Sequence, residues 1–215
     1  MTRPASRPNR RAVLLGLPLV PLALQGCAAP SVWASDEAVA QAYAPVTGET
    51  ALTLFTMKNS GSDNGAHTAL MIEADQRVIF DPAGSFETAA LPERNDLIYG
   101  VTEQVAEVYV SFHARDEYYV VAQRVAVPPE TAQAALALAQ QAGPVPRTRC
   151  TIATGRLLQQ LEGFEGIRPA LFPDRLMDQM ARIPGVETRI TREEDGGTLE
   201  ERRQALDARL GAAAD

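Results

Sequence analysis

The chain has 215 residues, of which 46% are hydrophobic and 22% are charged. A chain of this length and composition can bury one sizeable core, so we expect one globular domain. Arg3, Arg7, Arg10 and Arg11 are the only charged residues before Asp36, and the rest of the chain has 16 basic and 27 acidic residues, a net charge of -11. Such a negative surface repels a phosphate backbone, and we therefore expect no nucleic-acid partner.

Residues 1–26 have the pattern of an export signal. Four arginines precede an apolar run over residues 12–24, which is too short to span a bilayer and is interrupted by two prolines. The run ends in the sequence LQGC, residues 24–27, which resembles a bacterial lipobox. This resemblance implies cleavage before Cys27 and a diacylglycerol group on its thiol. A secretory signal with an incidental cysteine is the alternative, and the arginine pair at residues 10–11 also resembles a twin-arginine signal.

The residue after the lipobox cysteine bears on localisation. By resemblance to lipoprotein sorting signals, Ala28 implies the outer membrane, with the protein anchored by lipid and facing the periplasm. In that compartment Cys150 would be the only remaining thiol, with no partner for an intramolecular disulfide. Such a lone cysteine is either a buried packing residue or a nucleophile.

The next segments predict a tether and the first half of a sheet. Residues 27–48 form the tether, with a short helical piece near its end, and a folded domain follows over residues 49–195. Alternating apolar and polar residues predict strands over residues 50–58, 66–73 and 77–81, the last two joined by a hairpin. The period of two places His67 on the same face as Ala69 and Met71.

The second half of the domain is predicted to add strands and helices. Valine-rich runs at residues 104–112 and 117–127 predict an antiparallel pair of strands around a loop that contains His113. Helices are then predicted over residues 129–142, from Thr148 to Gly163, and over 174–183, before a last strand at 186–191. Residues 196–215 predict a solvated C-terminal surface helix that begins with a capping box at Thr198 and Glu201.

The helix after Thr148 carries the cysteine. With Thr148 as the N-cap, Cys150 lies in the first turn, where free backbone N–H groups and the helix dipole favour a thiolate. Apolar or small residues recur after it at helical spacing, which predicts that the thiol faces the sheet. Gly155 inside this helix predicts a close approach to a strand.

The order of these features resembles a known family. A strand, a polar loop, the sequence HTAL at the start of a second strand, a hairpin and a later cysteine that opens a buried helix are similar to the circularly permuted, NlpC-type branch of the papain-like cysteine hydrolases. The likeness spans about residues 52–161. It implies an α+β fold in which helices pack on an antiparallel sheet, with Cys150 as the nucleophile and His67 as the general base.

Two parts of the expected site are less specific. A polar side chain on the strand after the hairpin commonly orients the histidine in this family, and here Asp81 is the first polar residue in that region. Asp81 precedes a proline, however, so it could instead fix a turn through its own backbone. His113 is the alternative base, although its position near a loop predicts a surface histidine. The backbone N–H of Cys150 would supply one oxyanion donor, and the second donor is not identified.

No cofactor is expected. Two histidines and one free cysteine at long spacings make no zinc pattern, and no glycine-rich phosphate loop is present. The sequence therefore predicts an envelope lipoprotein with thiol-dependent hydrolase or acyltransferase activity on an amide or ester. A peptidoglycan peptide is the first expected substrate and a lipid acyl group the second. The alternative is a non-catalytic envelope lipoprotein that uses the same fold as a binding module.

The lipobox interpretation makes the first testable prediction. The mature protein should begin at an acylated Cys27, because signal peptidase cuts before the cysteine of a lipobox. Intact-mass spectrometry of membrane-extracted protein should detect the added diacylglycerol, and Cys27→Ser should block processing. An unmodified mature terminus at another residue would contradict the prediction.

Overall fold

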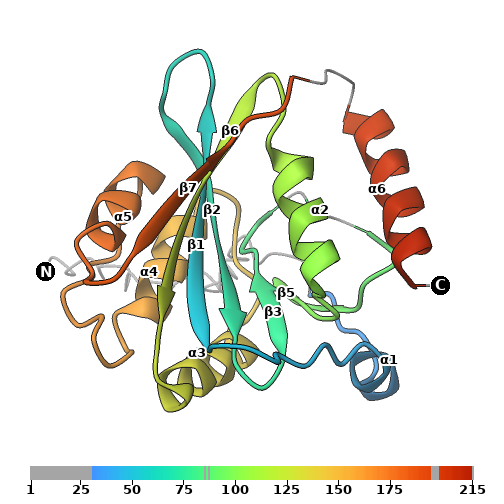
Figure 1. Ribbon diagram of the computed structural model, residues 1–215, viewed down its shortest axis with the longest axis horizontal. Coiled ribbons are helices and arrows are strands. Elements are labelled where there is room, and N and C mark those ends of the chain that lie inside the picture. The colour runs from blue at the N-terminus through green and yellow to red at the C-terminus, as the bar shows by residue number, and fades with distance from the viewer. Residues whose placement is uncertain (1–30, 85, 87, 195–198, 215) are drawn as a thin grey trace, which may run out of the picture.

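The computed structural model describes residues 31–84, 86, 88–194 and 199–214. In these residues the chain forms a seven-stranded antiparallel sheet with helices on both faces, in the strand order β4-β5-β3-β2-β1-β6-β7 (Figure 1). The expected α+β class is therefore confirmed. The predicted signal peptide, Cys27 and the Thr198 half of the predicted capping box lie outside the described residues.

The strands are β1 (Ala51–Asn59), β2 (Gly65–Glu73), β3 (Arg77–Phe80), β4 (Glu93–Arg94), β5 (Leu97–Ile98), β6 (Tyr118–Ala126) and β7 (Glu187–Thr191). The helices are α1 (Asp36–Gln41), α2 (Glu103–His113), α3 (Pro129–Gln141), α4 (Cys150–Leu158), α5 (Pro173–Met180) and α6 (Leu199–Ala214). In the part of the chain described, none of the helices is both long and apolar enough to cross a bilayer.

The strands at the centre of the sheet lie where the sequence predicts them, but β6 pairs with β1 and not with residues 104–112 as expected. β1 pairs with β2 on one side and with β6 on the other, and β3 folds back on β2 through the expected hairpin. Residues 51–58 of β1 are all buried, because both faces of this central strand are covered. The last predicted strand is also present, as β7, and it pairs with β6 at the edge of the sheet.

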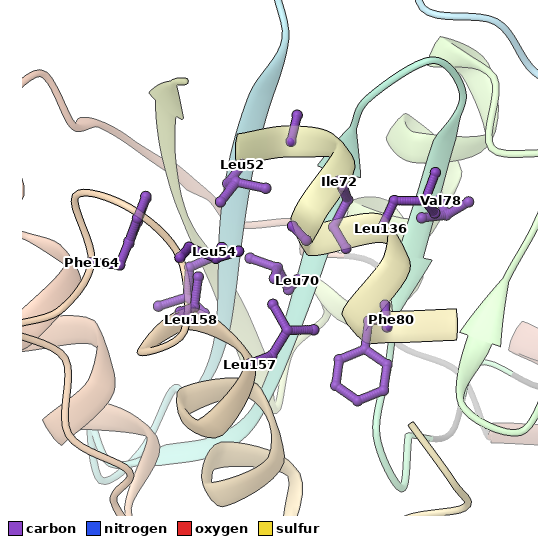
Figure 2. Close-up of a cluster of buried hydrophobic side chains, with 14 of the residues drawn as sticks. Leu52, Leu54, Leu70, Ile72, Val78, Phe80, Leu136, Leu157, Leu158 and Phe164 are labelled. Atoms are coloured by element: carbon purple, nitrogen blue, oxygen red, sulfur yellow. The ribbon is translucent and has the colours of Figure 1, made fainter. Parts of the chain in front are cut away.

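Two hydrophobic clusters lie on opposite faces of this sheet. On one face, Leu54 and Leu70 belong to the same cluster as Leu157 and Leu158 of α4, which Figure 2 shows together with Leu136 of α3. The other face carries a second cluster, built from sheet residues and from α2 and α6. In β1, β2 and β3, apolar residues alternate between the two clusters, as the pleat requires.

The predicted strand over residues 104–112 is wrong, because this segment is helix α2. The Thr102 side chain caps its N-terminus by accepting a hydrogen bond from the Val105 N–H at 3.2 Å. The buried apolar residues of α2 recur at intervals of three, one and three, which is helical spacing: Val105, Val108, Tyr109 and Phe112. Valine and tyrosine favour strands, but burial of this stripe outweighs their local preference.

Helix α4 begins one residue later than predicted. Its N-cap is Arg149, and Thr148 instead has a positive φ of 67° in the loop before it. Cys150 is therefore the first helical residue, which keeps it in the first turn as expected. Gly155 does allow a close approach, but the partner is a loop rather than a strand: a Cβ there would lie 3.0 Å from Pro169 Cα.

The C-terminal helix is more than the solvated surface element that its charges predict. Figure 1 shows α6 beside α2, and Leu206 and Leu210 are buried in the same cluster as the apolar side chains of α2. The expectation of a fully solvated helix is wrong because these two leucines, four residues apart, form a short apolar stripe among charged neighbours.

This packing makes a prediction about stability. Leu206→Ala should lower the free energy of unfolding by about 2–4 kcal/mol, since it removes a buried side chain and leaves a cavity. Leu171→Ala is the matched control, because Leu171 is 66% exposed, and it should change stability by less than about 0.5 kcal/mol. Urea denaturation of both variants would measure the difference, and equal effects would show that α6 is not packed.

Candidate active site

The site lies where β2 extends beyond β3. The pairing between these strands covers only residues 70–73 of β2, so residues 65–69 have no β3 partner along that edge. The N-terminus of α4 lies beside this part of β2: the backbone N–H of Thr68 is close enough to the Cys150 sulfur to help lower the pKa of the thiol. Beside it, the hydroxyls of Thr68 and Thr151 lie 3.3 Å apart. The open strand edge thus provides a docking point for the first turn of α4.

Cys150 and His67 reach each other from different sides of the sheet. The pleat places His67 on the face covered by α2, where its ring lies 6.4 Å from that of His113. Helix α4 packs on the opposite face. The two side chains nevertheless lie close enough for each to shift the pKa of the other, because Cys150 is at the helix terminus and β2 has no β3 partner at this position.

Asp81 completes a chain of three interacting groups. Its Oδ1 lies 2.5 Å from Nε2 of His67, which leaves Nδ1 as the ring nitrogen available to the Cys150 sulfur. The side chain of Asp81 is 3% exposed and that of His67 is 18% exposed. The structure therefore brings together all three predicted residues, with the carboxylate buried behind the imidazole.

These three groups shift one another's pKa values in the directions that favour the charged form of each. Burial by itself lowers the pKa of His67, but the charge and hydrogen bond of Asp81, and then those of Cys150, raise it from 6.5 to about 10. Burial by itself raises the pKa of Cys150, and the hydrogen bond and charge of His67 lower it below the ordinary value. His67 likewise holds the pKa of Asp81 low despite the burial of that carboxyl. The arrangement favours a carboxylate, an imidazolium and a thiolate together.

The same pKa shifts define the pH range over which the site stabilises the fold. Because the pKa of His67 in the folded protein lies above 6.5, its contribution to the free energy of unfolding is complete below pH 6.5. This contribution is lost as the pH rises through about 10. Because the pKa of folded Asp81 lies below 3.8, its contribution is present above pH 3.8 and is lost as the pH falls through the folded value. Both contributions to stability are therefore present between pH 3.8 and pH 6.5, the ordinary pKa values of the two side chains.

Asp81 also shapes the turn that follows it, so both interpretations of this residue hold. Its carbonyl accepts a hydrogen bond from the Gly84 N–H at 3.0 Å, and Ala83 between them has a positive φ of 57°. The turn folds Gly84 onto the carboxyl group: a Cβ there would lie 2.1 Å from Asp81 Oδ2. Only glycine fits at this position, which explains the sequence from Asp81 to Gly84.

Asp96 is a supporting residue that the sequence does not reveal. Its carboxylate accepts hydrogen bonds from the Ala83 N–H at 2.8 Å and the Val145 N–H at 2.7 Å. Its carbonyl accepts a third from the Asp81 N–H, also at 2.8 Å. Asp96 thus ties the turn after Asp81 to the loop that leads to Cys150. No spacing or motif marks it, because its partners are backbone groups from two distant segments.

Aromatic residues enclose the buried side of Asp81. The hydroxyl of Tyr109, in α2, lies close enough to Asp81 to lower the pKa of the carboxyl, although it does not reach the geometry of a regular hydrogen bond. His113 packs among Phe86, Tyr109 and Phe112, and its Nδ1 donates to the Tyr109 carbonyl at 2.9 Å. The expectation of a surface histidine at 113 is wrong, because residues 104–112 form a helix that carries it inward.

His67 is the histidine in position to serve Cys150. Its ring contacts Asp81 and lies close enough to the thiol to lower the pKa of Cys150, whereas the ring of His113, at the end of α2, lies 6.4 Å from that of His67. Among the residues that the structure describes, no group of three or more histidine, cysteine, aspartate or glutamate side chains could hold a metal ion. Acid-base and nucleophilic chemistry is what these side chains can perform.

Comparison of the chain with protein-family models, with curated proteins and with solved structures finds no match.

The close contact at Gly84 makes a prediction about the site. Gly84→Ala should displace the Asp81 carboxylate, because the new methyl group would overlap it. We expect the pKa of Cys150 to rise toward that of an ordinary thiol, followed by the pH dependence of thiolate absorbance at 240 nm. Gly143→Ala is the matched control, since a Cβ at residue 143 would meet nothing within 4 Å. An unchanged thiol pKa in Gly84→Ala would contradict the proposed role of the turn.

Proposed function

We propose that the protein is a cysteine hydrolase or acyltransferase that acts on an amide or ester bond. The observation that carries the proposal is the succession of neighbouring groups from Cys150 through His67 to Asp81, in which each pKa is displaced toward the charged form. A structural cysteine needs no such partners, and burial alone would raise its pKa. A thiolate beside an imidazolium is the reagent that acyl transfer requires.

The geometry supports a two-step reaction. The Cys150 thiolate attacks the acyl carbonyl, a C–S bond forms, and the carbonyl oxygen takes the negative charge. The Cys150 N–H, at the start of α4, is placed to stabilise this oxyanion. His67 then gives the Nδ1 proton to the leaving amine or alcohol as the C–N or C–O bond breaks.

The second step regenerates the thiolate. His67, now neutral, takes a proton from water or from an acceptor alcohol or amine, and that nucleophile attacks the thioester. The C–S bond breaks and the acyl group leaves as an acid, an ester or an amide. Asp81 keeps Nε2 of His67 protonated throughout, so that Nδ1 faces the sulfur in both steps. Water as the acceptor makes the protein a hydrolase, and another nucleophile makes it an acyltransferase.

The proposed family and location follow from the resemblance described above. The sheet, the histidine on β2 and the cysteine that opens α4 support a papain-like core of the permuted NlpC type. The lipobox at Cys27 supports a lipid anchor in the outer membrane. An enzyme tethered there faces the cell wall, and a peptidoglycan peptide is accordingly the first candidate substrate, with a lipid acyl group second.

Thiol labelling tests the proposal without a known substrate. In the full-length chain in detergent, Cys150 should react with iodoacetamide at pH 6 about 10- to 100-fold faster than in the denatured chain, where an ordinary thiol is well under 1% ionised. Mass spectrometry of the labelled peptide separates Cys150 from Cys27. His67→Ala should remove the advantage, and Asp81→Asn should reduce it because the imidazolium loses its partner.

The opposite result would favour a binding module. If folded Cys150 labels more slowly than denatured Cys150 at pH 6, and its rate rises only with the titration of an ordinary thiol, Cys150 is a packing residue. Equal rates in wild type and His67→Ala would likewise remove the basis for catalysis.

A further inference from the structure

A hollow lined by arginines lies beside the first turns of α4. It has a volume of about 490 Å³ and is formed by the loop over residues 144–149 and by the exposed side of the helix. Three of its lining residues are basic: Arg147, Arg149 and Arg156. No acidic residue lines it. In a chain with a formal net charge of -7, this grouping of one sign of charge around a concave surface needs an explanation.

In the part of the chain that the structure describes, the three arginines of the hollow make no ion pair that would stabilise the fold. Arg77, Arg94 and Arg124 all form ion pairs with carboxylates of the sheet or its connections. Among the described residues, by contrast, the guanidinium groups of the three arginines of the hollow have no ion pair or hydrogen bond, and all three side chains are exposed. Their charge is therefore available to a ligand.

The lining of the hollow includes the residue that precedes Cys150. Arg149 directly precedes Cys150, and Arg149, Ala153 and Arg156 recur at intervals of four and three, which aligns them in one stripe along α4. The stripe that begins at Cys150 faces the sheet, so the two stripes are neighbours on one helix. A ligand whose carbonyl meets the sulfur can extend into the hollow, where the positive end of the helix dipole adds to the arginine charges.

The chemistry of the lining favours a carboxylate on a peptide. Guanidinium groups bind carboxylates through paired, planar hydrogen bonds, and the proline and alanine residues of the hollow leave room for a short acidic side chain. A membrane surface would also supply anions, but it calls for exposed apolar side chains around the basic groups. The exposed large apolar residues lie elsewhere: Val32, Trp33, Tyr43, Leu171, Phe172 and Ile190.

We propose that this hollow is a subsite for a carboxylate of the acyl donor, close to the bond that Cys150 attacks. This inference rests on the proposed function and gives it a substrate class, an acidic peptide. The arginines would bind and orient the substrate, and the His67–Asp81 pair would still activate the thiol without them.

Two affinity labels that differ by one charge test the subsite. N-bromoacetyl-glutamate α-amide and N-bromoacetyl-glutamine α-amide both alkylate thiols, and only the first carries a side-chain carboxylate. In the full-length chain, Cys150 should react at least about 5-fold faster with the acidic label at low salt, and the preference should shrink as salt is added. The triple variant Arg147→Gln, Arg149→Gln, Arg156→Gln should react with both labels at the wild-type rate for the neutral label.

A second triple variant is the matched control. Arg175→Gln, Arg182→Gln, Arg189→Gln removes the same charge from exposed positions outside the hollow and should keep the preference. Equal rates with the two labels in wild type, or loss of the preference in the control variant, would overturn the subsite. So would competition by glycerol 3-phosphate at lower concentration than by N-acetyl-glutamate α-amide, which would indicate a phosphate ligand.

The two proposals fail in different ways. The neutral label reports thiol activation alone, so slow labelling by it overturns the proposed function and not the subsite. Binding of N-acetyl-glutamate α-amide to Cys150→Ser, followed by NMR chemical shifts, then tests the hollow by itself. Shifts at Arg149 and Arg156 that the triple variant abolishes would support it, and their absence in Cys150→Ser would overturn it.

Discussion

The early end of β3 is the constraint on which the site depends. Because β3 pairs with only the last four residues of the longer strand, residues 65–69 of β2 have no β3 partner, and the Cys150 sulfur lies close to the Thr68 N–H there. The same open edge lets His67, which leaves the sheet on the α2 face, meet a cysteine from a helix on the other face. A full-length β3 would separate the two side chains.

Charge coupling then determines the chemical state of the site. A buried carboxylate is costly unless it is paired, and Asp81 is paired with His67 at 2.5 Å. That pairing keeps the imidazole protonated, and the imidazolium in turn stabilises a thiolate on Cys150. The backbone supports this chain at two points, through Gly84, which leaves space for the carboxylate, and through Asp96, which ties the turn to the loop before α4.

The two sides of α4 have different tasks. Its sheet-facing side is apolar and holds the helix in place through residues such as Leu157 and Leu158 (Figure 2). Its exposed side carries Arg149 and Arg156 with no acidic partner among the described residues. If Cys150 is the nucleophile as proposed, one helix carries both the thiol at its terminus and a charged surface beside it, so that substrate recognition and chemistry share a rigid element.

The sequence by itself predicted most of the strands and helices, and the family resemblance that it carries pointed to Cys150, His67 and Asp81 as candidate site residues. Period-two alternation identified β1, β2 and β3, and helical spacing after Cys150 identified the buried side of α4, because neighbours within one element follow from its own geometry. The strand predicted from residue propensities at 104–112 is a helix, because burial of its apolar stripe against the sheet outweighs those local preferences. Only the tertiary structure revealed Asp96, the enclosure of Asp81 by Tyr109, and the meeting of His67 and Cys150 at an open strand edge. These contacts join residues far apart in the chain, and no local pattern encodes which strand ends early or which backbone groups it leaves unpaired.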